Sequence, residues 1–133
     1  MDRIFPSFAR LALFVVFFWF GFLKLIGESP ASPLVNELLQ KTLPFISFEQ
    51  FIVFFGFFEM VIGLCFLIPK FNRIAFLLFI FHMGMTMLPL LLLPKEIWSG
   101  FFIPTIEGQY IIKNIALIAL ATGLMGRQGK KQL

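Results

Sequence analysis

The chain has few charged residues and a single cysteine. Charged residues make up 14% of its 133 residues and apolar residues 59%, whereas soluble domains carry about 25% charged residues. A soluble domain of this size buries too little of its surface to hide so many apolar side chains. This excludes a soluble enzyme, a disordered tail and a nucleic-acid-binding domain. Because Cys65 is the single cysteine of this sequence, a disulfide within the chain and a Cys-x-x-Cys redox pair are both excluded.

Apolar residues, including 21 Phe, are abundant and gather in four uninterrupted runs. The runs cover residues 8–26, 48–68, 74–93 and 109–125. Each is close to the roughly 20 residues that a helix needs to cross a hydrocarbon core of about 30 Å. Lipid offers the backbone no hydrogen bonds, and the runs do not alternate as barrel strands do. The sequence therefore predicts an all-α integral membrane four-helix bundle that forms one domain over residues 1–133.

The two longer loops contain local signals of their own. In residues 33–41 the apolar side chains share one face, and Ser32 followed by Pro33 is typical of a helix start. This pattern predicts a short amphipathic helix on the membrane surface. The loop before the last run carries Trp98, Phe101 and Phe102, and such aromatic residues favour the headgroup level of the bilayer.

Lys and Arg are concentrated at both termini and in the short middle loop. The residues on this side are Arg3, Arg10, Lys70, Arg73, Arg127, Lys130 and Lys131. By the positive-inside rule, both termini are predicted to be cytoplasmic. Residues 1–31 also resemble a cleavable signal peptide, with a basic start and a cleavage site after Ala31. Lys24 lies where the apolar part of a signal should end, which favours a first helix that is retained.

Ionisable residues inside the four runs are the best pointers to function, because such groups are costly in lipid. Lys24, Glu49 and Lys113 are expected in the outer leaflet. Glu59 lies about 15 Å deeper than Glu49 along its helix. His82 lies about 12 Å from the cytoplasmic end of its own helix. The sequence therefore predicts that Glu59 and His82 share the midplane of the membrane.

Helical spacing predicts that these polar positions face the inside of the bundle. Gly56 and Gly63 recur at intervals of seven after Glu49, with Glu59 on nearly the same face, and glycine lets a second helix approach closely. In the last run the polar positions at helical spacing are Tyr110, Lys113 and Asn114.

Other interpretations of the same residues stay open. Lys24 and Lys113 can extend to the headgroups without any further role. Glu59 cannot do so from the midplane, so it is either protonated or paired, with His82 as the nearest candidate. That pair can be a structural clasp or a site that handles protons. A copper site on His82 and Met85 is the weakest alternative, and we predict no metal.

Three motifs resemble the DoxX-like membrane protein family, in its YkgB-type subgroup. They are Arg10 followed by FWFGFLKLIG, then FEMVIGLCFLIP, then PTIEGQYIIKN at residues 104–114. The resemblance extends from about residue 8 to residue 126, and implies a four-helix bundle of the bacterial inner (cytoplasmic) membrane. The candidate positions that it implies are Gly21, Lys24, Glu59, His82, Glu107, Tyr110 and Lys113.

Members of this family include the small membrane subunit of a thiosulfate–quinone oxidoreductase. The resemblance thus favours a redox accessory subunit with no cofactor of its own, which contacts a quinone and needs a soluble oxidoreductase partner. Glu59 and His82 would handle protons, and Lys24 or Lys113 would bind a quinone carbonyl. Two alternatives remain: a non-enzymatic assembly or partner protein, and a small carrier or lipid-binding protein. The lipid bilayer and a second copy of the chain are further expected partners, and nucleic acid is not.

Overall fold

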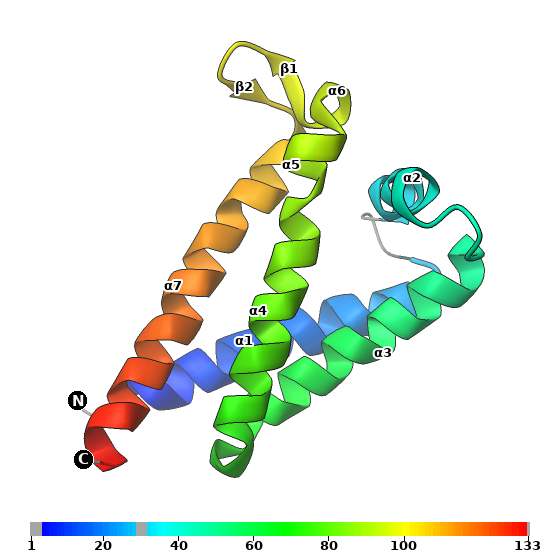
Figure 1. The fold of residues 1–133 in the computed structure, drawn as a ribbon. Coiled ribbons are helices and arrows are strands. Elements are labelled where there is room, and N and C mark those ends of the chain that lie inside the picture. Colours follow the sequence, from blue (N-terminus) through cyan, green and yellow to red (C-terminus); the bar gives the residue numbers. More distant parts are fainter. Residues whose placement is uncertain (1–3, 29–31, 133) are drawn as a thin grey trace.

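A computed structural model describes residues 4–28 and 32–132, with side chains described as far as residue 126. Helices dominate, and within these ranges four are long and apolar enough to span a membrane. The four spans cover Ile4–Leu25, Phe48–Leu67, Pro69–Leu92 and Ile106–Gly126. The structure is therefore mostly helical with the four predicted candidate spans, and the start of the first span and the end of the last lie at the same end of the molecule (Figure 1).

Two of the spans, α1 (Ile4–Leu25) and α3 (Phe48–Leu67), run side by side in opposite directions (Figure 1). Gly21 and Gly56 lie at their contact. A Cβ atom added to either glycine would lie 2.6 Å from the backbone oxygen of the other. Gly63 faces the α1 backbone in the same way, with Phe18 N 3.0 Å from its added Cβ atom. Glycine thus permits a backbone approach that any side chain would prevent.

The third span is not the single helix predicted for 74–93. It begins with a 3-10 turn, η1 (Pro69–Phe71), continues as α4 (Asn72–Met87), and ends as the short helix α5 (Pro89–Leu92). Pro89 has no N–H to donate and disfavours helical geometry in the residue before it. Leu88 N instead donates to Met85 O at 3.2 Å, which tightens the last turn of α4.

The connections between α1 and α3 and between α5 and the last span contain secondary structure of their own. The helix predicted for residues 33–41 is present as α2 (Ser32–Thr42), and its Leu39 is buried. Lys41 Nζ donates to Leu92 O at 2.8 Å and so links α2 to the end of α5. After α6 (Pro94–Ile97), strands β1 (Trp98–Gly100) and β2 (Ile103–Pro104) form an antiparallel hairpin.

The last helix, α7 (Ile106–Gln132), extends beyond the predicted 109–125 at both ends. Thr105 fixes its start, because the hydroxyl of Thr105 accepts from Gly108 N at 3.1 Å. Thr105 N also donates to Ile97 O at 2.7 Å. A Cβ atom on Gly108 would collide with Ile97 O, so this glycine lets α6 lie directly against the first turn of α7.

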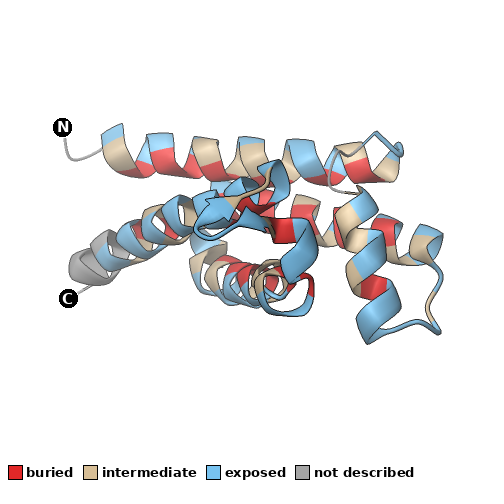
Figure 2. Ribbon diagram, turned by 90° about the horizontal axis from the view of Figure 1, so that it is seen from above, coloured by how far each residue is buried: buried red, intermediate tan, exposed pale blue. Residues whose placement is uncertain are grey.

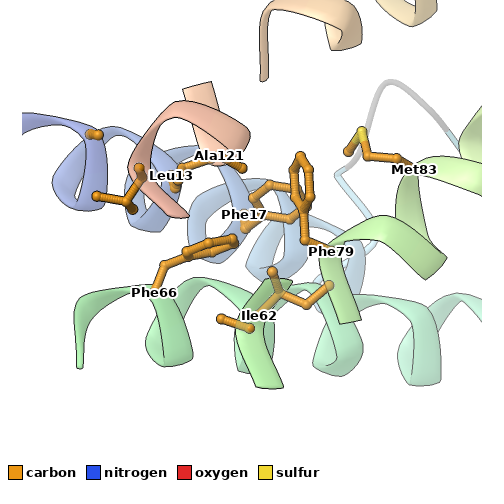
Figure 3. Packing of buried hydrophobic residues seen from close by; sticks show 10 residues of the cluster. Leu13, Phe17, Ile62, Phe66, Phe79, Met83 and Ala121 are labelled. Carbon is orange, nitrogen blue, oxygen red and sulfur yellow. The ribbon is translucent and has the colours of Figure 1, made fainter. Parts of the chain in front are cut away.

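The apolar core lies where α1, α3, α4 and α7 meet (Figure 3). Its labelled side chains are Leu13, Phe17, Ile62, Phe66, Phe79, Met83 and Ala121 (Figure 3). Buried positions follow the inner sides of the helices, while their outer sides are exposed (Figure 2). Many of the exposed side chains are large and apolar, such as Phe8, Phe54 and Phe81, as expected for helix faces that contact lipid.

Candidate functional site

Three ionisable side chains from three different spans form one chain of polar contacts. Lys24 of α1 lies with Nζ 3.0 Å from Glu59 Oε2 on α3. His82 of α4 lies with Nε2 2.9 Å from Glu59 Oε1. The three residues are only 5%, 4% and 5% exposed, respectively. The Glu59 carboxylate thus joins three membrane-spanning helices through its two oxygens, and we call this group the Lys24–Glu59–His82 network.

The close approach of α1 and α3 positions two members of the network. Lys24 follows Gly21 by three residues, and Glu59 follows Gly56 by three, so each ionisable residue lies one turn from a glycine. A Cβ atom on Gly21 would lie 3.0 Å from Glu59 Cβ. A Cβ atom on Gly56 would lie 3.1 Å from Lys24 Cβ. Each glycine therefore leaves the space into which the ionisable residue of the other helix fits.

The charges of the network balance. The Lys24 ammonium and the Glu59 carboxylate cancel, so a neutral imidazole at His82 leaves the group without net charge. This composition limits the cost of removing charges from water, which is high unless they are paired and hydrogen-bonded. The Phe55 ring adds to the pairing, with Lys24 Nζ 5.5 Å from its centroid. The same ring stacks on His82 at 5.1 Å.

The predicted proximity of Glu59 and His82 is confirmed, but the predicted grouping of Lys24 with Glu49 and Lys113 is wrong. Lys24 instead contacts Glu59 and so joins the predicted pair. The physical reason is the length of the lysine side chain. Its four-carbon stem lets the ammonium lie several ångströms from its own Cα, along the helix in either direction. Burial against Glu59 also rules out the interpretation that Lys24 simply extends to the headgroups.

The inward orientation predicted for the other polar residues is wrong for Glu49, Tyr110 and Lys113, which are exposed. Glu49 lies in the first turn of α3, where Ser47 caps the helix and a carboxylate is favourable at the surface. Asn114 is half-buried, with Nδ2 3.4 Å from Thr86 Oγ1. The side of α7 that packs on the other helices is apolar, and it contributes Ala121 and Leu124 to the core. The polar residues near the start of α7 therefore face outward.

Other implied positions also lie away from the network. Glu107, implied by the family resemblance, is exposed in the first turn of α7. Gly63 packs on α1 one turn below Glu59 and contributes to the helix contact alone.

Arg10 makes contacts that its predicted role as a marker of topology does not include. Arg10 is buried, and its Nη1 donates to Phe66 O at 2.9 Å and to Asn72 Oδ1 at 2.7 Å. It thereby satisfies a carbonyl at the end of α3 and links α1 to the start of α4. A signal was present, because Arg10 lies inside the predicted span 8–26 rather than before it.

Comparison with known proteins adds no relative: no protein-family model, curated protein or solved structure matches the chain. Membership of the DoxX-like family therefore stays a prediction from the three motifs.

Proposed function

We propose that this chain is a small DoxX-like subunit of a quinone-linked redox system in a bacterial inner membrane. In this proposal the Lys24–Glu59–His82 network handles the protons that accompany electron transfer. One observation carries it: three buried ionisable side chains from separate candidate spans meet at hydrogen-bond distance. Ionisable residues at this depth are costly and typically mark proton or ligand pathways.

The chemistry of the three groups supports proton handling. A histidine ring can carry a proton on either nitrogen, and a neighbouring carboxylate can accept a hydrogen bond from it, which are the properties of a proton-transfer group. When His82 takes up a proton, the Glu59 carboxylate lies between two cations and shares both hydrogen bonds. The network can therefore hold one additional proton while no ionic group is left without a partner. A purely apolar contact between the same helices would lack this capacity.

The quinone and the electron source define the rest of the proposal. Lys24 has three N–H donors, and the contact with Glu59 uses one of them. A quinone carbonyl that reaches α1 could therefore bind the same ammonium. The electrons come from a soluble oxidoreductase partner. The chain itself supplies a membrane site for the quinone and a place for its proton.

Purification in a mild detergent tests this proposal. The wild-type chain, Glu59→Gln and Glu49→Gln are each tagged and isolated from membranes, and mass spectrometry identifies the co-purifying proteins and the extracted lipids. Glu49→Gln is the matched control, because this exposed acid lies on the same helix. We expect quinone and an oxidoreductase with the wild type and the control, and at least about tenfold less quinone with Glu59→Gln. Bulk lipid without quinone in all three samples would contradict the proposal.

A non-enzymatic partner protein is the second candidate, and the β1–β2 hairpin favours it. Phe101 and Phe102 at its tip are 88% and 80% exposed, and their ring centroids are 4.4 Å apart. Phe102 has a φ of 59°, an uncommon conformation for a residue other than glycine. Such backbone geometry is frequent at functional sites. If this candidate is correct, Phe101→Ser together with Phe102→Gly removes the co-purifying protein, whereas Glu59→Gln does not.

A further inference from the structure

Basic side chains gather where the turn between α3 and α4 meets the first half of α1. Lys70 lies in η1, Arg73 lies in the first turn of α4, and both side chains are exposed. Arg10 holds this turn from within, because its Nη1 donates to Phe66 O and to Asn72 Oδ1. The turn lies at the same end of the molecule as the start of α1 and the end of α7 (Figure 1). We call Arg10, Lys70 and Arg73 the basic cluster.

The charge of the basic cluster has no counterpart among the acidic side chains that the structure describes. Glu59 is paired with Lys24 in the network. The other described acids lie in the connections and first helix turns of the opposite end, and they are Glu28, Glu37, Glu49, Glu96 and Glu107. One end of the described chain therefore carries only positive charge, and such a surface attracts anions.

Apolar side chains that are exposed lie directly beside the two exposed cations. Leu67 and Ile68 precede Lys70, and Ile74 follows Arg73. Lys70 and Arg73 also lie at the start of the candidate span Pro69–Leu92, at the level where a bilayer has its headgroups. A soluble anion would satisfy the cations and leave the apolar side chains without a partner. A phospholipid supplies a phosphate for the cations and acyl chains for the apolar side chains.

We infer that the basic cluster binds an anionic phospholipid, with the phosphate at Lys70 and Arg73 and the acyl chains along the neighbouring apolar side chains. Ion pairs and apolar contact are the whole interaction. A zwitterionic lipid brings an ammonium group together with its phosphate, and no described carboxylate at this end can pair with that ammonium. Arg10 acts through the turn that it holds and through its charge. This inference does not depend on the proposed function.

Native mass spectrometry of the full chain in a mild detergent tests the inference. The probes are phosphatidylglycerol and phosphatidylcholine with identical acyl chains, so that only the headgroup differs. The test variant combines Lys70→Gln with Arg73→Gln, and a second variant exchanges the two cations, as Lys70→Arg with Arg73→Lys. The matched control combines Lys95→Gln with Lys113→Gln, because these exposed lysines lie at the opposite end.

The wild-type chain should bind phosphatidylglycerol about twentyfold more tightly than phosphatidylcholine, since each cation near a membrane surface contributes about fivefold. The Lys70→Gln, Arg73→Gln variant should lose most of this preference. The exchanged variant keeps both charges and should keep the preference, as should the control. Added salt should weaken the preference in every protein that shows it, because salt screens exposed charges.

Two results would overturn the inference on the wild-type chain alone. The first is equal affinity for the two lipids. The second is displacement of phosphatidylglycerol by an equal concentration of glycerol 3-phosphate, which has the phosphate but no acyl chains and would identify a site for soluble anions. Among the variants, a preference that survives in Lys70→Gln, Arg73→Gln, or that is lost equally in the control, would also contradict the inference.

Discussion

At the scale of single residues, Glu59 is the member of the network that contacts both of the others. Its two oxygens lie 3.0 Å from Lys24 Nζ and 2.9 Å from His82 Nε2, at a position only 4% exposed. Removal of one partner from such a group leaves the other charge buried and unpaired, which is far more costly than removal of both.

This asymmetry predicts the result of a double-mutant cycle. Glu59→Gln should lower the free energy of unfolding by about 3–5 kcal/mol, because the Lys24 ammonium loses its counterion. The double variant Lys24→Met with Glu59→Gln should lose less than the sum of the two single variants. Thermal unfolding in a fixed detergent, followed by circular dichroism, measures all four proteins. Additivity of the single effects to within about 0.5 kcal/mol would show that the two residues do not interact.

Arg10 gives a second prediction at this scale. Arg10→Met removes the hydrogen bonds to Phe66 O and Asn72 Oδ1 and leaves both acceptors without this donor. The expected loss is about 1.5–3 kcal/mol, as for hydrogen bonds to charged groups. Arg73→Met is the control, because Arg73 is exposed at the same end of the molecule. Equal melting temperatures for the two variants would refute the structural role of Arg10.

The residues of the network differ in how far the sequence predicts them. Depth along two helices places Glu59 and His82 together, because a short side chain stays near the level of its own Cα. The level of Lys24 does not predict its partner, since the long stem lets the ammonium lie either way along the helix. Phe17, Phe55 and Phe58 around His82 have no signal at all, because with 21 Phe in the chain none is distinctive.

At the scale of secondary structure, the contact between α1 and α3 determines whether the network can form. Gly21 and Gly56 bring the backbones together, and each faces the ionisable residue of the other helix. Helix packing and the Lys24–Glu59 ion pair are therefore one structural unit.

Gly56→Ala tests this coupling. Its new Cβ atom would lie 2.6 Å from Gly21 O, so the helices must separate, at a cost of about 1–3 kcal/mol. Gly84→Ala is the control, since nothing lies within 4 Å of an added Cβ atom at that exposed position of α4. This control should be neutral or up to about 1 kcal/mol more stable, because alanine favours the helix. A stable Gly56→Ala protein that retains bound quinone would contradict the coupling.

Apolar runs predict the existence of the four spans but not their ends. The length of an apolar run is limited by the bilayer, whereas helix ends depend on local hydrogen bonds. Pro89 divides the third span because it lacks an N–H, which is readable in the sequence. The start of α7 depends on contacts of Thr105 and Gly108 with Ile97 of the preceding helix, and a single sequence does not reveal that these segments meet.

At the scale of the whole molecule, the start of α1 and the end of α7 lie at the same end of the four candidate spans (Figure 1). The distribution of Lys and Arg predicts that this side is cytoplasmic. In a Cys65→Ser background, single cysteines at Ser7 and at Ser99 of the hairpin report on the two sides. An impermeant thiol reagent added to intact cells should label Ser99→Cys and not Ser7→Cys. The opposite labelling would reverse the topology.

The most direct test of the central claim is quinone-linked electron transfer in membranes that contain the chain and its partner. We predict that Lys24→Met and Glu59→Gln each lower the rate by about a hundredfold or more, the range typical for loss of a proton-transfer group. The exposed controls Lys113→Met and Glu49→Gln should retain the wild-type rate, with all four proteins present at equal amounts. Full activity of Lys24→Met and Glu59→Gln would show that the Lys24–Glu59–His82 network only holds the helices together, and would contradict the account.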